Sequence, residues 1–411
     1  MKVEGILIII IALIMGFVLS GIFNSNLIEG KKGSKISDYF KKKRGLFKED
    51  IECRGAESAL DCINCLYSKG RKDKYSYMFC RGTIPPFTPG YIPDPTPLGQ
   101  PPTPGCEDIV VTITDANYTQ AVQNIKYKDK LKCFDVSSVT DMSNPLLDDF
   151  KEDISGWNVS SVTTMGNMFF GCSAFNKPLN GWNVSNVTAM GGMFRDCTAF
   201  NQPLNGWDVS SVENMIGMFL KCSAFNQPLN GWGEKVSSVI SMMSMFSGCS
   251  AFTQDLSSWN VSSVTNMDNM FSGCSIFNEP LNGWEEHVSG VTNMGYMFRG
   301  CSAFDQPLSN WNVSSVENMN GMFRDCTVFN GDISGWNVSS VTDMGYMFSR
   351  CIEFNQDLSS WDVSKVTNMR GMFFGCRKTD NIKNTIDYWI KIEIPVFNNI
   401  VNKYKYLDIL I

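Results

Sequence analysis

Histidine is almost absent from this sequence, since His287 is the only one in 411 residues. A single histidine cannot supply the His cluster of a metal site, and no Ser-His-Asp set can be assembled around it. The sequence also has no Gly-rich phosphate loop, and its carboxylates form no pair that differs from ordinary solvated charge. We therefore expect no catalytic residues, no bound metal and no cofactor.

Basic residues are scarce in the larger part of the chain. Between Phe134 and Cys376 there are 23 acidic residues and 10 basic ones, whereas residues 31–48 contain eight basic residues and one acidic one. Nucleic-acid binding depends on neutralising phosphates, so the acidic region argues against it. The basic stretch has two open interpretations, a contact with anionic lipid headgroups or a solvated linker.

One long apolar run lies near the N-terminus. Residues 5–23, GILIIIIALIMGFVLSGIF, would span about 28 Å as a helix, which is enough to cross a bilayer core. We expect residues 1–30 to be a single-pass anchor, with a signal peptide cleaved near Gly21 as the alternative. The positive-inside rule would keep the Lys-rich flank, and everything after it, on the cytosolic side.

Cysteines outside the repeats suggest the opposite topology. After the basic stretch at 31–49, a small Cys-bearing module is expected at 50–82, and a stiff proline-rich spacer at 83–105. The spacing C-x8-C-x2-C-x14-C leaves disulfides, one zinc or free thiols open, and its irregular first interval favours disulfides. Disulfides would place the following region on an extracellular or virion surface. The candidate disulfide cysteines are Cys53, Cys62, Cys65, Cys80, Cys106 and Cys133.

One motif is repeated nine times between residues 157 and 376. Its tryptophans and cysteines recur every 25 residues, or every 27 where an insertion follows the tryptophan. A fixed period of this size predicts a solenoid. Residues 106–156 are expected to form an N-terminal cap with a degenerate repeat, and residues 377–411 a C-terminal cap. The expected structural ladder is Trp157, Trp182, Trp207, Trp232, Trp259, Trp284, Trp311, Trp336, Trp361, Cys172, Cys197, Cys222, Cys249, Cys274, Cys301, Cys326, Cys351 and Cys376.

The unit reads as a short strand followed by a short helix and a loop. Alternation of Trp207 and Val209 predicts the strand, and apolar residues spaced by three and four from Val212 to Cys222 predict the helix. Ser210 and Glu213 have the form of a capping box. We therefore expect an α/β repeat solenoid in which the regularly spaced cysteines are small buried hydrophobes.

The unit WNVSSVTNMDNMFSGCSIFNEPL, from Trp259 to Leu281, closely resembles the BspA-like leucine-rich repeat of bacterial surface proteins. The resemblance covers residues 134–376. It implies a leucine-rich-repeat-like solenoid, a role in adhesion or host interaction, and no enzymatic activity.

Two functions are compatible with this organisation. The first is a membrane-tethered surface protein whose solenoid binds an unknown protein or glycan, and the second is a structural component of an envelope or virion that uses the solenoid as a rigid spacer. Specificity in a solenoid comes from its variable positions. The candidate binding surface consists of Tyr296, Arg299, Tyr346, Arg350, Arg195, Arg324, Glu285, Glu286 and His287. Asn or Asp directly after the tryptophan is expected to cap a turn.

Overall fold

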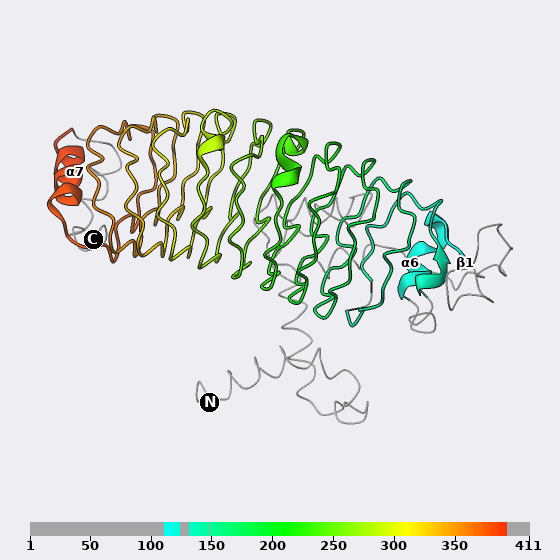
Figure 1. Cartoon of the computed structure of the whole chain (residues 1–411). Coiled ribbons are helices and arrows are strands. Elements are labelled where there is room, and N and C mark those ends of the chain that lie inside the picture. The colour runs from blue at the N-terminus through cyan, green and yellow to red at the C-terminus, as the bar shows by residue number, and fades with distance from the viewer. Residues whose placement is uncertain (1–110, 124–130, 147, 393–411) are drawn as a thin grey trace, which may run out of the picture. The chain divides into compact units, whose positions relative to one another are not determined.

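The computed structural model describes residues 111–123, 131–146 and 148–392. All of them belong to the second of the chain's two units, Phe87–Ile411. The repeats follow one another as stacked layers between the elements near residue 111 and the last helix (Figure 1). The described elements are β1 (Val111–Thr112), α6 (Asp115–Gln123), β2 (Phe134–Asp135), the 3-10 helices η4 (Asn230–Val236) and η5 (Asn282–Trp284), and α7 (Asp380–Lys391).

The described repeats are a solenoid, but their units are not the strand and helix that the sequence predicts. Strands β1 and β2 pair in parallel, and the register continues through single-residue parallel bridges from Asp141↔Thr164 to Asp343↔Asn368. Hydrogen-bonded turns and irregular segments make up most of the rest of each layer, and η4 and η5 lie in two of the layers. The prediction of an α/β unit is therefore wrong in its local structure, although the layered architecture is present.

Backbone amides in the Met-Phe segment alternate between two kinds of partner, and this explains the absence of a helix. The amides of Met215 and Phe219 donate to carbonyls of the next layer, at 3.2 and 2.9 Å, whereas the amide of Met218 donates back to the Met215 carbonyl at 3.1 Å. An α-helix needs every amide to reach the carbonyl four residues earlier. Because alternate amides bond between layers, that pattern cannot form.

Left-handed backbone also interrupts any helix in the unit. In the layer that begins at Trp207, Gly217 and Lys221 have φ values of 59° and 62°, whereas an α-helix requires φ near about −63°. The amide of Ser210 donates to Asp208 Oδ1 at 3.3 Å, so this segment is an Asx turn. The capping box expected at Ser210 and Glu213 is therefore wrong, because no helix follows it.

The same turn occurs after most of the tryptophans. The side-chain oxygen of Asn or Asp accepts the amide of the serine two residues later at positions 158, 183, 208, 260, 312, 337 and 362. The predicted turn-capping role of these residues is confirmed.

The core is a set of identical side chains that stack from layer to layer. Phe194 and Phe219 have ring centroids 5.6 Å apart and planes only 4° from parallel, and Trp232 stacks on Trp259 at 5.9 Å. All nine ladder tryptophans are at most 4% exposed. Each layer therefore buries its aromatic and methionine side chains only against its neighbours.

The segment FNQPLNGW, which begins at Phe200 and again at Phe225, forms hydrogen bonds between adjacent layers. Asn201 Oδ1 accepts the main-chain amide of Asn226 at 2.9 Å and Gln227 Nε2 at 3.2 Å. Trp232 Nε1 donates to the Leu204 carbonyl of the preceding layer at 2.9 Å. The residues of this repeated segment thus connect one layer to the next.

Different elements close the two ends of the stack. At the first layers, the Asp115 carboxylate accepts the amides of Thr140 and Asp141 at 2.7 and 3.1 Å. At the last layers, α7 buries Ile382, Ile386 and Trp389, and Thr385 Oγ1 accepts the amide of Leu358 at 2.9 Å.

Several expectations lie outside the described residues, namely the segment 5–23, the regions 31–49, 50–82 and 83–105, and Cys53, Cys62, Cys65, Cys80 and Cys106. Cys133 is described, is 8% exposed and is not one of the free thiols of the described chain. The disulfide hypothesis stays a prediction. Nowhere in 111–123, 131–146 or 148–392 does a helix have the length and apolar character needed to cross a bilayer.

Candidate functional site

Each layer carries two positions with left-handed backbone. The first is the second residue between the paired methionines, and the second directly precedes the cysteine. Glycine fills half of these eighteen positions, as expected for φ between 54° and 79°. The other nine are Asn167, Asp196, Lys221, Ser244, Asn269, Tyr296, Asp325, Tyr346 and Arg350.

Tyr296, Tyr346 and Arg350 are unusual occupants of such positions. Their φ values are 54°, 56° and 61°, and a bulky side chain in this region is uncommon because its Cβ crowds the backbone. Such residues cost on the order of 1–3 kcal/mol and cluster at functional sites. They indicate a surface where the contacts of a large side chain outweigh the cost of a strained backbone.

These residues belong to a band of charged and aromatic side chains along the last four layers, which we call the basic ridge. In each layer the band consists of the two residues between the paired methionines and the two before the cysteine. All five arginines between Phe134 and Cys376 occupy positions of this band, Arg195 in an early layer and the other four in these last layers. The repeat region as a whole is acidic, so the ridge is a local reversal of charge. The basic ridge consists of Tyr296, Arg299, Arg324, Asp325, Tyr346, Arg350 and Arg370.

Guanidinium groups lie over both tyrosine rings of the ridge. The Arg299 guanidinium carbon is 5.7 Å from the Tyr296 ring centroid. Tyr346 has two such neighbours, Arg324 at 5.4 Å and Arg370 at 5.9 Å. These distances fall within the range of cation–π attraction. The contacts hold the rings and the charges together as one surface.

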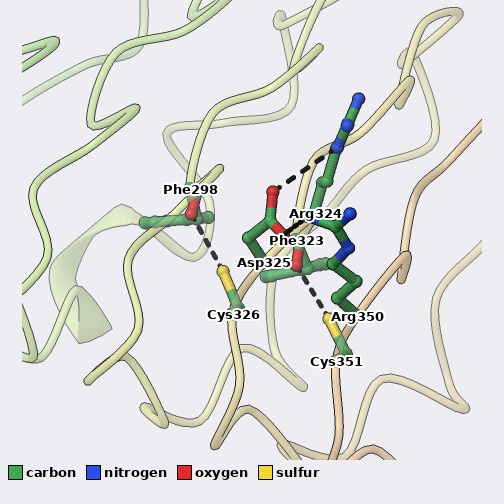
Figure 2. A network of polar contacts seen from close by, with 7 residues as sticks. All are labelled: Phe298, Phe323, Arg324, Asp325, Cys326, Arg350 and Cys351. Atoms are coloured by element: carbon green, nitrogen blue, oxygen red, sulfur yellow. Dashed lines mark hydrogen bonds and ion pairs between the residues drawn. The ribbon is translucent and has the colours of Figure 1, made fainter. Parts of the chain in front are cut away.

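Asp325 is the carboxylate that pairs with this cluster. Its Oδ1 lies 3.3 Å from Arg350 Nη1, and its Oδ2 lies 3.5 Å from Arg324 Nε (Figure 2). Among the described residues, no carboxylate lies within ion-pair distance of Arg299 or Arg370. The ridge therefore keeps an excess of positive charge.

Each tyrosine ring lies against a glycine of the following layer. A Cβ added to Gly321 would overlap the Tyr296 ring, and one added to Gly371 would come within 2.7 Å of Tyr346 Cε1. Glycine at these two positions therefore lets the rings lie along the ridge. Partial burial raises the pKa of Tyr296; the positive charges of Arg324 and Arg299 oppose that rise, and the carboxylates of Asp343 and Asp268 add to it.

The other expected surface residues are not part of the ridge. Arg195 is 9% exposed, lies over the Phe170 ring at 5.2 Å and is 3.6 Å from Asp196. Glu285 follows η5, and its Oε1 accepts Asn310 Nδ2 at 3.1 Å. Glu286 is exposed, and His287 is half-buried with its amide donating to the Trp284 carbonyl.

The sequence reasoning did not single out two members of the ridge, Arg370 and Asp325. Asp325 directly precedes Cys326, as Arg350 precedes Cys351, and Arg370 is the first residue between Met369 and Met372, next to the position that Tyr346 fills in its own layer. Their place at these variable positions is the signal that identifies them.

The ladder cysteines are hydrogen-bond donors rather than reactive groups. Eight of them, from Cys197 to Cys376, donate the thiol to a phenylalanine carbonyl of the preceding layer at 2.7–3.1 Å. Burial raises the pKa of each ladder thiol, and for Cys376 the pKa rises to about 12. Thiols that stay protonated are poor nucleophiles and poor metal ligands. In the part of the chain that the structure describes, no His, Cys, Asp and Glu cluster could hold a metal ion.

Comparison with known proteins identifies a repeat family. Its family model, described as "Mycoplasma protein of unknown function, DUF285", matches residues 116–232, 205–288 and 286–389. No curated protein and no solved structure matches the chain.

Proposed function

We propose that this chain, which belongs to the DUF285 repeat family, is a surface protein whose solenoid binds an external protein or glycan through the basic ridge. The observation that carries the proposal is the gathering of arginine and tyrosine side chains on one band of an otherwise acidic repeat region. Tyrosine and arginine are, with tryptophan, the residues enriched at binding hot spots.

The difference between the invariant and the variable positions of the repeat supports this function. The residues that are the same in all copies of the repeat are buried or form hydrogen bonds to adjacent layers. The residues of the basic ridge occupy positions that differ between copies. Its strained tyrosines and Arg350 are retained where glycine would fit the backbone better. A scaffold alone would not need them.

Surface presentation and a membrane tether form the second half of the proposal. They rest on the apolar segment 5–23, the proline-rich spacer 83–105 and the resemblance of the unit to the BspA-like repeat. The family match to a repeat protein of unknown function is compatible with them.

Accessibility on intact cells or particles tests the proposal. An epitope tag after Ile411 and brief protease treatment should yield cleavage within residues 134–376 without lysis. Complete protection of the repeats in intact cells, with cleavage only after lysis, would rule out surface presentation.

The alternative is a structural component of an envelope or virion that uses the solenoid as a spacer. The uninterrupted stack of buried rings favours a stiff element, for example Phe271, Phe298 and Phe323 at 5.7 Å intervals. In that case the repeats would be shielded, and ridge variants would leave every binding property unchanged.

A further inference from the structure

We infer that the basic ridge binds an acidic glycan, that is, an extended sugar chain that carries carboxylate or sulfate groups. This inference names the ligand class for the ridge and so rests on the proposed binding function. It follows from the charge of the ridge, its aromatic faces, its backbone strain and its repeat distance.

The charge of the ridge requires an anionic ligand. Arg299, Arg324, Arg350 and Arg370 face a single ridge carboxylate, Asp325, which bonds only the middle two. A guanidinium presents its donors in a planar fork that matches carboxylate and sulfate oxygens. Arg299 and Arg370, at the two ends of the cluster, thus provide guanidinium groups with no described carboxylate within ion-pair distance.

The tyrosine rings favour a sugar over a simple anion. Tyr296 and Tyr346 lie along the ridge, each against a glycine of the next layer and beside a guanidinium. A half-buried ring offers an apolar face beside a polar edge. A sugar ring has the complementary structure, with an apolar C–H face and a polar rim.

Backbone strain indicates that these side chains serve a purpose other than fitting the local backbone conformation. The position of Tyr296 and Tyr346 is glycine in four other layers, at residues 192, 217, 321 and 371. Glycine fits its left-handed backbone without strain. The two tyrosines therefore strain the backbone for contacts that lie on the surface, with arginine side chains of the ridge, and this places their rings where a ligand can reach them.

The spacing of the ridge suits a linear polymer. Phe298, Phe323 and Phe348 mark three successive layers of the ridge with ring centroids 5.7 and 5.8 Å apart. Each layer of the ridge contributes charged or aromatic groups, so such groups recur from layer to layer. An extended polysaccharide presents its acidic groups in the same periodic way, whereas the acidic patch of a folded protein has no such repeat.

Binding of the full-length chain to defined polymers tests the inference. The probes are hyaluronan for carboxylate, heparin for sulfate, dextran as a neutral sugar polymer and polyglutamate as an acidic polypeptide. We expect binding to hyaluronan or heparin that weakens with salt, because screening reduces charge attraction, and no binding to dextran.

Matched variants locate the contact. Arg299→Gln with Arg370→Gln should weaken glycan binding at least about tenfold, since each removes a charge-assisted contact. Lys365→Gln removes a positive charge from the same layer as Arg370 but off the ridge, and should leave affinity unchanged. Tyr346→Gly should also weaken binding, whereas Asn269→Gly, at an equivalent left-handed position, should not.

Three outcomes would overturn the inference: no binding to either acidic glycan, equal affinity for polyglutamate, or equal affinity in the arginine double variant and Lys365→Gln. Each result is independent of the protease experiment. If protease reaches the repeats on intact cells but the chain binds no glycan, only the assignment of the ligand is wrong. Shielded repeats would remove the proposed surface function, whatever the purified chain binds.

Discussion

The thiol of Cys326 lies 2.9 Å from the main-chain carbonyl oxygen of Phe298 in the preceding layer and donates a hydrogen bond to it (Figure 2). Cys351 makes the same bond to Phe323 at 2.7 Å. These carbonyls also accept the amides of Cys301 and Cys326 in their own layers at 2.9 and 3.0 Å, so each ladder thiol adds a second, interlayer hydrogen bond besides filling space.

Replacing a central cysteine should separate these two roles. Cys274 is fully buried and bonds the Phe246 carbonyl at 3.1 Å. Cys274→Ala removes the second donor to this carbonyl, which keeps the Cys249 amide, and leaves a small cavity, so we expect a loss of about 1–2 kcal/mol in the free energy of unfolding. Cys274→Ser keeps a donor and should lose less. Urea unfolding followed by tryptophan fluorescence measures both, and a smaller loss for alanine than for serine would contradict the donor role.

Alkaline pH should destabilise the solenoid through the same thiols. Burial raises the pKa of Cys249, Cys301 and the other ladder cysteines above the ordinary value of 9.0. Thiols of the unfolded chain ionise near that pH while the folded ones stay protonated. Their stabilising contribution is therefore complete below pH 9 and is lost as pH rises above it, by about 1.4 kcal/mol per thiol per pH unit.

Urea midpoints at pH 8, 9 and 10 measure this dependence. The midpoint should fall between pH 9 and 10, and the fall should be smaller in Cys274→Ala, which has one titrating thiol fewer. A midpoint that is flat across this range would contradict burial of the ladder thiols.

A double-mutant cycle tests the contact between Tyr296 and Gly321. Gly321→Ala places a methyl group against the Tyr296 ring and strains a left-handed backbone. Gly217→Ala has nearly the same φ but meets only Leu220 at 3.6 Å, so it reports the backbone cost alone. We expect Gly321→Ala to lose more unfolding free energy than Gly217→Ala.

Tyr296→Gly should remove that excess, because the methyl group then has room. Thermal unfolding of the single and double variants gives the coupling energy. Equal effects of Gly321→Ala with and without the tyrosine would show that the ring does not occupy this place.

The asparagine of the repeated FNQPLNGW string should matter for stability through its acceptor oxygen. Asn226 Oδ1 accepts the Thr253 amide at 2.9 Å and Gln254 Nε2 at 2.8 Å. Asn226→Ala should cost about 1–2 kcal/mol, since both donors lose their partner. Asn226→Asp keeps the oxygen and should cost less, as Asp305 accepts the Asn330 amide in the same role. Melting temperatures that fall equally in both variants would contradict this assignment.

The layered architecture could be predicted from sequence because its signal is long-range and redundant. Nine tryptophans and nine cysteines with one period leave few alternatives to a stack. The inward direction of these side chains followed from their apolar character, and the turn role of Asn158 and Asp208 followed from the exchange of Asn for Asp.

The local structure could not be predicted by the same reasoning. Met215, Met218, Phe219 and Cys222 have helical spacing, yet a chain of turns also brings them to one face. The distinguishing feature is the left-handed backbone at Gly217 and Lys221, which a single unit does not reveal. Comparing all nine copies does, because glycine, Asn and Asp recur at those two positions.

The basic ridge was only partly predictable, for a related reason. Tyr346 and Arg370 are 24 residues apart, and their contact depends on how successive layers stack. The sequence identified variable positions within a layer, but pairing across layers is a property of the folded chain. Arg370 and Asp325 lie at such variable positions, and their contacts across layers assign them to the ridge.

The most direct test of this account measures binding and stability in the same preparations of two variants. The Arg299→Gln, Arg370→Gln double variant should lose at least about tenfold in affinity for hyaluronan or heparin and keep its unfolding free energy within about 0.5 kcal/mol. Asn226→Ala should lose stability and keep its affinity. Unchanged glycan affinity in the arginine variant would contradict the central claim that residues at the variable positions of the repeat form the binding surface.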